Sequence, residues 1–321
     1  MKKTRELIEA HLKLVDVVLE VCDARIPVSS RNPIIGGLTA GKQRVLILNK
    51  SDLADKEATK AWLECFNAGG LRSLALNSMS GQGISAVYKK LEYAEAERAS
   101  AGTARNRAKL PLRMMIVGIP NSGKSSLINR LVGKRATQVG DRPGVTRGKQ
   151  WLTLENGMQL LDTPGILWPK FEDPQVGLNL AFCGSIRDEI MDITELALEL
   201  LTVLLRNHAG LLAERYGVDT DGEDESFGQA QTSANESSGQ AQTSQDDSFG
   251  ASQTSLAVME RIANKRGYIL PGKRVDYERT ARALLDEFRA GKIGRITLEL
   301  PEARTQRIKD GVPVAPGELY T

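Results

Sequence analysis

The stretch that most constrains the fold of this chain is Gly118-Ile119-Pro120-Asn121-Ser122-Gly123-Lys124-Ser125-Ser126, which fits the pattern G-x-x-x-x-G-K-[ST]. An apolar run at 112–117 precedes it, as expected of a buried strand, and an amphipathic segment at 126–132 follows it, as expected of a helix. Glycines in such a loop let the backbone wrap an anion, toward which the loop and helix amides point. Lys124 then reaches the β- and γ-phosphates of a nucleotide, and Ser125 holds Mg²⁺. Taken alone, the stretch also fits a glycine-rich turn that binds nothing.

Bulk properties set the broad class of protein. A chain of 321 residues is long enough for about two domains. It has no run of 18 apolar residues, so we expect no membrane span. The N-terminus turns directly into an amphipathic helix with no apolar signal core. Cys22, Cys65 and Cys183 lie far apart, which favours a reducing, cytoplasmic location.

The net charge of +3 conceals an uneven distribution. Residues 219–255 hold 8 acidic and no basic residues, so the rest of the chain carries 43 Lys and Arg against 32 Asp and Glu. That excess favours a polyanionic partner, although solubility alone also explains a basic surface. The 219–255 segment repeats Gln-Ala-Gln-Thr-Ser at 229–233 and 240–244 and has no apolar periodicity, so we expect a disordered insert that acts as a spacer.

The first half of the chain alternates predicted strands with predicted helices. Strands are predicted at 15–22, 44–48, 71–76 and 112–117, and helices at 4–14, 56–68 and 83–98. This alternation indicates a parallel α/β sheet, in which ligands bind at the carboxyl ends of the strands. A hairpin is predicted at 151–161, and the pattern becomes helical from about 188, with an apolar stripe that includes Leu196, Leu200 and Leu204. We therefore predict an α/β domain at 1–185 and a helical domain at 186–218 and 256–321.

Two short motifs follow strands of this predicted sheet. Asn49-Lys50-Ser51-Asp52 fits the guanine motif N-K-x-D, in which Asp52 accepts hydrogen bonds from N1–H and the exocyclic amine of guanine. Adenine offers neither donor there, so this carboxylate selects GTP over ATP. Asn49 is expected to brace the loop and Lys50 to lie along the base. Asn77-Ser78-Met79 is placed to offer a backbone N–H to the guanine oxygen O6.

The remaining nucleotide contacts are predicted after the phosphate loop. Thr146 is the candidate that closes over Mg²⁺ and the γ-phosphate. In Asp162-Thr163-Pro164-Gly165, Asp162 would hold a water bound to Mg²⁺ and the Gly165 amide would contact the γ-phosphate. An ordinary small GTPase has its phosphate loop first and its guanine motif later. Here the order is reversed, which a circularly permuted chain allows because domain termini often lie close together.

The motifs and their order resemble the circularly permuted GTPases of the YlqF/YawG group. The resemblance rests on Asp23-Ala24-Arg25-Ile26-Pro27, Ser30-Arg31-Asn32-Pro33, Asn49–Asp52, Gly118–Ser126, Pro143–Thr146 and Asp162–Gly165. It implies a P-loop GTPase fold, with a parallel-rich sheet flanked by helices and an all-helical C-terminal domain. It also implies GTP hydrolysis coupled to late assembly of the large ribosomal subunit, contact with ribosomal RNA, and no DNA partner. Ordering of residues 165–185 by the γ-phosphate is expected to reposition the helical domain.

The catalytic group is the least determined part of the site. Ras-like enzymes orient the attacking water with a Gln after D-x-x-G, where this chain has Ile166. The resemblance implies that Asn121 binds a K⁺ ion beside the phosphates, although a loop-shaping role also fits Asn121. It further implies a water-positioning His in a Pro-Gly-His segment just before the position of Met1, and the sequence begins after that segment. His11 and His208 lie in predicted helices and are expected to be structural. We therefore expect tight GTP binding with slow intrinsic turnover, assisted by Lys124 and Thr146.

Basic residues gather near the C-terminus, where they are predicted to contact RNA phosphates without reading sequence. A solvated charged face also fits them. They are Arg261, Lys265, Arg266, Lys273, Arg274, Arg279, Arg282, Arg289, Lys292 and Arg295. The alternative function is a GTP-binding scaffold or switch with little useful hydrolysis, and Ile166 is what favours it. A phosphotransferase acting on a metabolite would leave Asn49–Asp52 unexplained.

Overall fold

The computed structural model divides the chain into two compact units, which we call the α/β unit and the helical unit. The α/β unit comprises Met1–Ile186 and Arg295–Thr321, and the helical unit comprises Arg187–Gly294. Together, the described residues are 2–39, 41–100, 110–133, 138–139, 151–161, 173–220 and 243–301.

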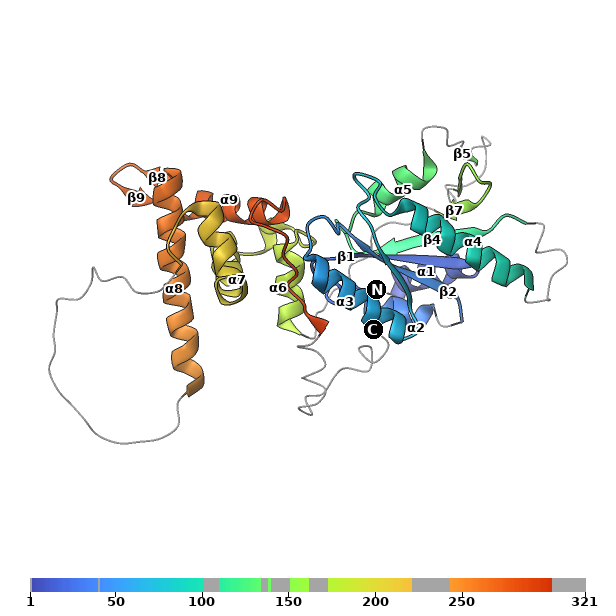
Figure 1. Ribbon diagram of the computed structural model, residues 1–321, viewed down its shortest axis with the longest axis horizontal. Coiled ribbons are helices and arrows are strands. Elements are labelled where there is room, and N and C mark those ends of the chain that lie inside the picture. Colours follow the sequence, from blue (N-terminus) through green and yellow to red (C-terminus); the bar gives the residue numbers. More distant parts are fainter. Residues whose placement is uncertain are drawn as a thin grey trace. The chain divides into compact units, whose positions relative to one another are not determined.

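The α/β unit is built on a seven-stranded sheet among these residues, in the order β3-β2-β1-β4-β7-β6-β5 (Figure 1). The central strands β1 (Val17–Asp23), β2 (Gln43–Asn49), β3 (Arg72–Ala75) and β4 (Arg113–Gly118) are parallel, and β7 (Gln159–Leu161) pairs parallel with β4. β6 (Trp151–Thr153) and β5 (Gln138–Val139) continue the sheet as antiparallel strands. Hence the loops after β1, β2 and β4 meet at one edge of the sheet.

Helices cover both faces of the sheet, and side chains along β1 point alternately to the two faces. Val17, Leu19 and Val21 pack with α4 (Ile84–Ser100) and α5 (Lys124–Val132) on one face. On the other face, Val18 packs with α1 (Lys2–Leu12) and α2 (Pro33–Leu38), and Cys22 packs with α3 (Lys56–Ala68). Figure 1 shows α4 and α5 above the sheet and α2 and α3 below it. Because both faces are covered, β1 is apolar along most of its length and fully buried.

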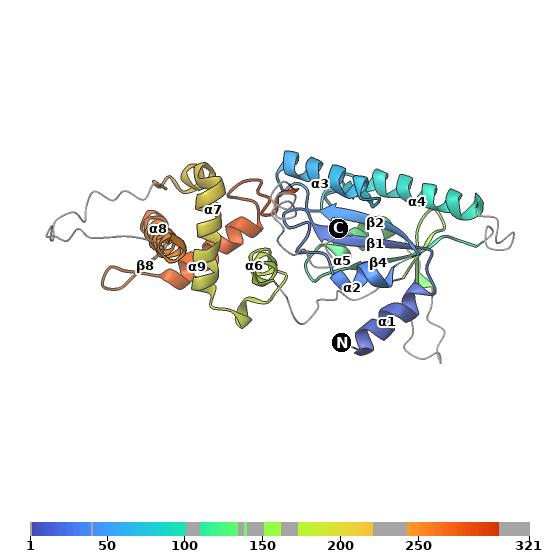
Figure 2. The same cartoon turned by 90° about the horizontal axis from the view of Figure 1, so that it is seen from below.

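The helical unit packs α7 (Ile193–Tyr216), α8 (Thr243–Arg266) and α9 (Tyr277–Arg289) around one another (Figure 2). A short helix, η1 (Asp188–Ile190), precedes them, and a small hairpin of β8 (Ile269–Leu270) and β9 (Arg274–Val275) joins α8 to α9. The predicted leucine stripe on α7 is buried, from Leu196 through Leu200 to Leu204. α7 is long and apolar enough to cross a membrane by length and composition alone, although the sequence predicts no span. Its buried leucines contribute instead to the core of this unit.

Two predicted boundaries differ from the structure. α8 begins at Thr243 rather than at 256, so the last part of the segment predicted to be disordered is helical, while residues 221–242 lie outside the described part. The predicted helical domain also ran on to 321, whereas residues from Arg295 onward belong to the α/β unit. The sequence of 295–299 has no periodicity that assigns it to either unit. Its place in the α/β unit is set by hydrogen bonds to residues more than 100 positions earlier in the chain. One further helix, α6 (Pro174–Phe182), lies in the α/β unit and follows Asp173, whose side chain caps it.

Candidate nucleotide-binding site

The phosphate loop joins the end of β4 to the start of α5, and two of its glycines are required by close approach. Gly118 has a φ of +154°, and a Cβ there would lie 2.4 Å from the Val21 carbonyl oxygen. Gly123 has a φ of +91°, and its Cβ would lie 2.0 Å from Nδ2 of Asn49. No other residue type fits either position without moving neighbouring atoms, because L side chains disfavour these φ values.

The N-terminus of α5 is arranged as an anion site. Gly123 caps this helix without any side-chain hydrogen bond to its first amides, which leaves those donors for a ligand. Lys124 is buried and donates from Nζ to the Ile119 carbonyl oxygen at 2.6 Å. Burial lowers the pKa of Lys124 to about 8. Ser125 is exposed at the helix start and Ser126 is half-buried. A phosphate placed here would meet amide dipoles and a lysine whose charge burial has destabilised.

Asn49 joins the guanine-motif loop to the phosphate loop and to the loop after β3. Its side-chain Nδ2 donates to the Ser122 carbonyl oxygen at 2.8 Å, and its Oδ1 accepts from the Ser78 amide at 3.0 Å. Asn49 and Ser122 are fully buried and Ser78 nearly so. One carboxamide at the end of β2 therefore braces the loops on either side of it, as its predicted role requires.

Beneath these loops lies a buried ion cluster. Asp23, at the end of β1, accepts from Arg25 at 3.0 and 2.8 Å and from Nζ of Lys50 at 2.8 Å. Burial alone would raise the pKa of Asp23, but the two cations hold it well below its usual range. Lys50 has a φ of 59°, so the guanine motif turns sharply at this residue. The Lys50 ammonium, predicted to lie along the base, is thus fixed to Asp23 in the structure.

Two further side chains, one from the loop itself and one from α5, hold the loop after β3. Oδ1 of Asn77 accepts from the amides of Met79 and Ser80 at 2.8 and 3.1 Å. Arg130, on α5, donates to the carbonyl oxygens of Ser78 and Met79. The amides of Ser78, Met79 and Ser80 each already donate to a side-chain oxygen, so a guanine O6 would share one of these amides with its protein acceptor. Met79 itself is exposed.

The other predicted site residues fall into two groups. Ser51 is half-buried and Asp52 is exposed beside this edge of the sheet. Asn121 is also exposed and has a φ of 58°, and its Nδ2 donates to the Gly184 carbonyl oxygen at 2.5 Å. The second group lies outside the described residues, and it comprises Thr146, Asp162, Gly165 and Ile166.

The two histidines occupy helices, as the sequence predicts. His11 is buried near the end of α1, and His208 lies at a kink of α7, where its φ is −144° and its ψ is 29°. Sequence reasoning missed Arg130, which holds the loop after β3, and assigned Arg295 to RNA contact, whereas its side chain bonds to the loop after β2. No local signal marks either arginine. For Asp23 and Arg25 a signal existed, since their motif directly follows a predicted strand.

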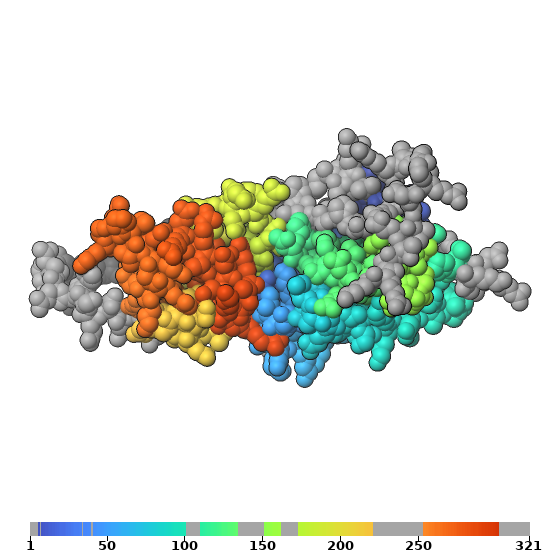
Figure 3. Space-filling model, turned by 90° about the horizontal axis from the view of Figure 1, so that it is seen from above, coloured from blue at the N-terminus to red at the C-terminus, as the bar shows by residue number. Residues whose placement is uncertain are grey.

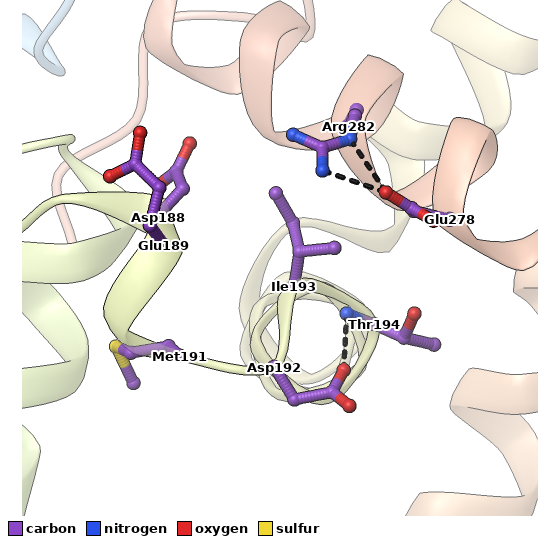
Figure 4. Close-up of a pocket in the computed structure, with 8 residues that line it drawn as sticks. All are labelled: Asp188, Glu189, Met191, Asp192, Ile193, Thr194, Glu278 and Arg282. Atoms are coloured by element: carbon purple, nitrogen blue, oxygen red, sulfur yellow. Dashed lines mark hydrogen bonds and ion pairs between the residues drawn. The ribbon is translucent and has the colours of Figure 1, made fainter.

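A separate pocket of about 390 Å³ lies wholly within the helical unit (Figure 4). Asp188, Glu189, Asp192 and Glu278 contribute to its lining, and Arg282 donates to Glu278. Asp192 points its carboxylate at the α7 N-terminus, where it accepts from the Thr194 amide at 2.8 Å. The acidic lining makes this pocket unsuited to a phosphate, so it is not part of the nucleotide site.

A braced phosphate loop at the edge of a mostly parallel sheet, reached after the guanine loop in the chain, defines a circularly permuted P-loop GTPase. Residues 113–215 match a family model described as "50S ribosome-binding GTPase". Ribosome biogenesis GTPase A of Bacillus cereus is 38% identical over 313 residues, covering 97% of this chain and 95% of that protein. The chain belongs to the ribosome biogenesis GTPase A family, and it is a GTPase.

Solved structures of YlqF are similar to this chain over nearly its whole length. The GNP-bound structure of YlqF from Thermotoga maritima has a TM-score of 0.58 and 28% identity, covering 94% of this chain and 99% of that one. A GDP-bound YlqF structure has the same TM-score and identity and covers 92% of this chain and 99% of that one. The family therefore binds guanine nucleotides.

Proposed function

We propose that this GTPase acts in the cytoplasm in late assembly of the large ribosomal subunit and binds the pre-ribosome and its RNA in a nucleotide-dependent way. The observation that carries the proposal is the Asn49 bridge, which joins the phosphate and guanine loops of a chain matching ribosome biogenesis GTPases end to end. A phosphate loop alone serves many reactions. A phosphate loop bonded to the N-K-x-D loop favours a guanine nucleotide, and the similarity to ribosome biogenesis GTPases favours the pre-ribosome as the partner that responds to it.

The proposed nucleotide contacts follow the geometry of the described loops. Asp52, which follows Lys50 and Ser51 in the motif, would accept from the guanine base, and the Asn77–Met79 loop would face its oxygen. The amides of Gly118–Ser126 and the Lys124 ammonium would hold the phosphates. Mg²⁺ fits the exposed Ser125 hydroxyl at the α5 N-terminus and would neutralise developing phosphate charge. Thr146 and, through water, Asp162 are the further Mg²⁺ ligands that the sequence motifs suggest.

A potassium ion beside the phosphates fits Asn121. Because Nδ2 of Asn121 donates to Gly184, its Oδ1 is the atom that would face a cation. A K⁺ there would supply positive charge to the phosphates. We further propose that the Gly165 amide contacts the γ-phosphate.

The RNA-binding role is proposed for only part of the predicted basic set, because several members have acidic partners inside the helical unit. Arg289 bonds to Asp188 at 2.7 and 2.8 Å, and Arg282 bonds to Glu278 at 2.7 Å. Such pairs lose part of their attraction for an external phosphate, because the partner carboxylate offsets their charge. These arginines are better explained as a paired, solvated face.

The β8–β9 hairpin is the stronger candidate for RNA contact. Lys273, at its turn, and Arg274, the first residue of β9, are exposed, and so are Ile269 and Leu270 of β8. The orange part of the surface in Figure 3 includes this stretch of the chain. Exposed cations next to apolar side chains can bind phosphates while covering a sugar or base. This hairpin therefore offers the RNA contact that we propose for the helical unit.

The test is GTP turnover by the full chain in potassium buffer, with and without purified large ribosomal subunits. We expect slow turnover alone and strong stimulation by the large subunit, with less stimulation by small subunits. Replacing K⁺ with Na⁺ should lower the stimulated rate. Lys124→Ala is the matched inactive control and should abolish turnover under every condition.

Absence of stimulation by large subunits, with GTP still bound, would contradict the assembly role and favour a scaffold or switch for another partner. A preference for xanthine nucleotides in Asp52→Asn would support the guanine assignment separately. These two measurements distinguish an error about the partner from an error about the base.

A further inference from the structure

Residues Arg295–Glu299, which we call the C-terminal strap, return from the helical unit to the α/β unit. Their backbone joins the loops after β1 and β2. The Leu298 amide donates to the Arg25 carbonyl oxygen at 2.8 Å, and the Ile296 amide donates to the Leu53 carbonyl oxygen at 3.0 Å. In Figure 1 the red end of the ribbon lies beside α3, to which the strap is also bonded. The strap thus runs along the guanine-motif loop.

Arg295 forms hydrogen bonds with that loop on both sides of Asp52. Its Nε donates to the Ala54 carbonyl oxygen at 2.9 Å, and one terminal nitrogen donates to the Ser51 carbonyl oxygen at 2.6 Å. Thr297 adds a third point, because its Oγ1 accepts from the Asp55 amide at 3.0 Å. The carbonyl oxygens of Ser51 and Ala54 and the amide of Asp55 are therefore all hydrogen-bonded to the strap.

The far end of the strap is anchored by a half-buried carboxylate. Glu299 accepts from the amides of Val28 and Ser29 at 2.6 and 3.0 Å and from Nδ2 of Asn179 at 3.1 Å. Its carbonyl oxygen accepts from Nε1 of the buried Trp62 at 2.6 Å. An anchor with this many partners fixes the position of the strap, so Arg295 presents its guanidinium to the loop in one orientation.

Two backbone hydrogen bonds flank Asp52 in the guanine-motif loop. The Leu53 amide donates to the Lys50 carbonyl oxygen at 2.9 Å, and the Ser51 amide donates to the Leu76 carbonyl oxygen at 3.1 Å. Asp52 lies between these two bonds and is exposed. Recognition of guanine by one carboxylate depends on its direction, because two hydrogen bonds must form at once. The Arg295 contacts add a constraint on the residues around Asp52, besides those of Asn49 and Lys50 earlier in the motif.

We infer that Arg295 is a positioning residue for guanine recognition, which holds the loop so that Asp52 faces the base. This inference rests on the proposed role of Asp52. It makes base selectivity depend on a residue that follows the helical unit in the chain, more than 240 residues after the motif itself.

The test uses the full chain and compares binding of GDP with binding of inosine diphosphate, which keeps N1–H but lacks the exocyclic amine. In Arg295→Met, which keeps the apolar stem, we expect GDP affinity to fall roughly tenfold and inosine diphosphate affinity to fall less. The GDP preference over inosine diphosphate should therefore shrink several-fold. Arg206→Met removes an exposed arginine of α7 and is the matched control, with both affinities unchanged.

A purely structural role for Arg295 predicts a different result, in which both affinities fall by the same factor or only the unfolding midpoint changes. Either result would overturn the inference. Thr297→Val carries the same test if Arg295→Met does not fold, with a smaller loss in the same direction. Asp52→Asn distinguishes the two proposals. If that variant switches to xanthine nucleotides while Arg295→Met keeps an unchanged ratio of GDP to inosine diphosphate affinity, only the positioning role of Arg295 is refuted. No switch in Asp52→Asn refutes the assignment on which the strap depends.

Discussion

The Asn49 bridge predicts a large effect for Asn49→Ala. The substitution removes the donor to the Ser122 carbonyl oxygen and the acceptor for the Ser78 amide, which lie at 2.8 and 3.0 Å. Each buried backbone group left without a partner costs about 1–3 kcal/mol, so the two together give about 2–6 kcal/mol. A water entering the vacated space would satisfy part of that loss. We therefore expect the free energy of unfolding to fall by about 2–3 kcal/mol.

The chain offers a direct assay for this effect. Trp62 on α3 and Trp151 on β6 lie in the α/β unit, so their fluorescence during urea unfolding reports on that unit, while Trp168 lies outside the described residues. GDP affinity should also fall by about tenfold, because the phosphate and guanine loops lose their common brace. Asn129→Ala, at an exposed position of α5, is the control and should stay within about 0.5 kcal/mol of the unaltered protein. The reasoning fails if Asn49→Ala matches that control in both stability and affinity.

Two further predictions concern charged groups of the site. The pKa of Lys124 is lowered by burial to about 8, and a bound phosphate raises it, so binding takes up a proton as the pH approaches and passes 8. GDP affinity should therefore fall as the pH rises from 7 to 9, by up to about tenfold per pH unit above 8. Titration calorimetry should show that Lys124→Met loses this pH dependence. An equal slope of GDP affinity against pH in both proteins would refute Lys124 as the group that takes up the proton. Asp23→Asn removes the buried carboxylate that pairs with Arg25 at 2.8 Å and should cost about 3–5 kcal/mol in urea unfolding, against about 0–1 kcal/mol for Glu278→Gln, which breaks an exposed pair. A loss for Asp23→Asn as small as that for Glu278→Gln would show that the cluster is not a buried ion pair.

The arrangement of the fold follows from local sequence patterns. The β-branched run at 15–22 becomes β1, and the apolar run at 44–48 becomes β2, each within two residues of its predicted ends. Both strands are buried on both faces, so their composition alone distinguishes them from the amphipathic helices around them. The reversed motif order then required the permuted sheet that the structure has. The Asn49 brace was predictable for the same reason, since its role follows from its place at a strand end.

Contacts between distant segments left no such signal. Arg130 bonds to the loop after β3 from α5, and Arg295 bonds to the guanine-motif loop from the C-terminal strap. Neither position belongs to a motif, and an arginine in a helix or a tail has many other uses. The strap was assigned to the helical domain because helices precede it. The hydrogen bonds of Glu299 with residues near 28 reverse that assignment, and no local propensity encodes them.

The chain leaves the α/β unit after Ile186 and re-enters it at Arg295, so the helical unit is topologically an insertion rather than a tail. Cutting the chain after Ile186 would remove the helices and, with them, every strap contact to the guanine-motif loop. Loss of nucleotide binding in such a fragment would say nothing about the helices themselves. An excision that joins 186 to 295 through a flexible linker would keep those contacts. The same topology allows the inserted helices to be exchanged as a cassette while the nucleotide site retains all of its own residues.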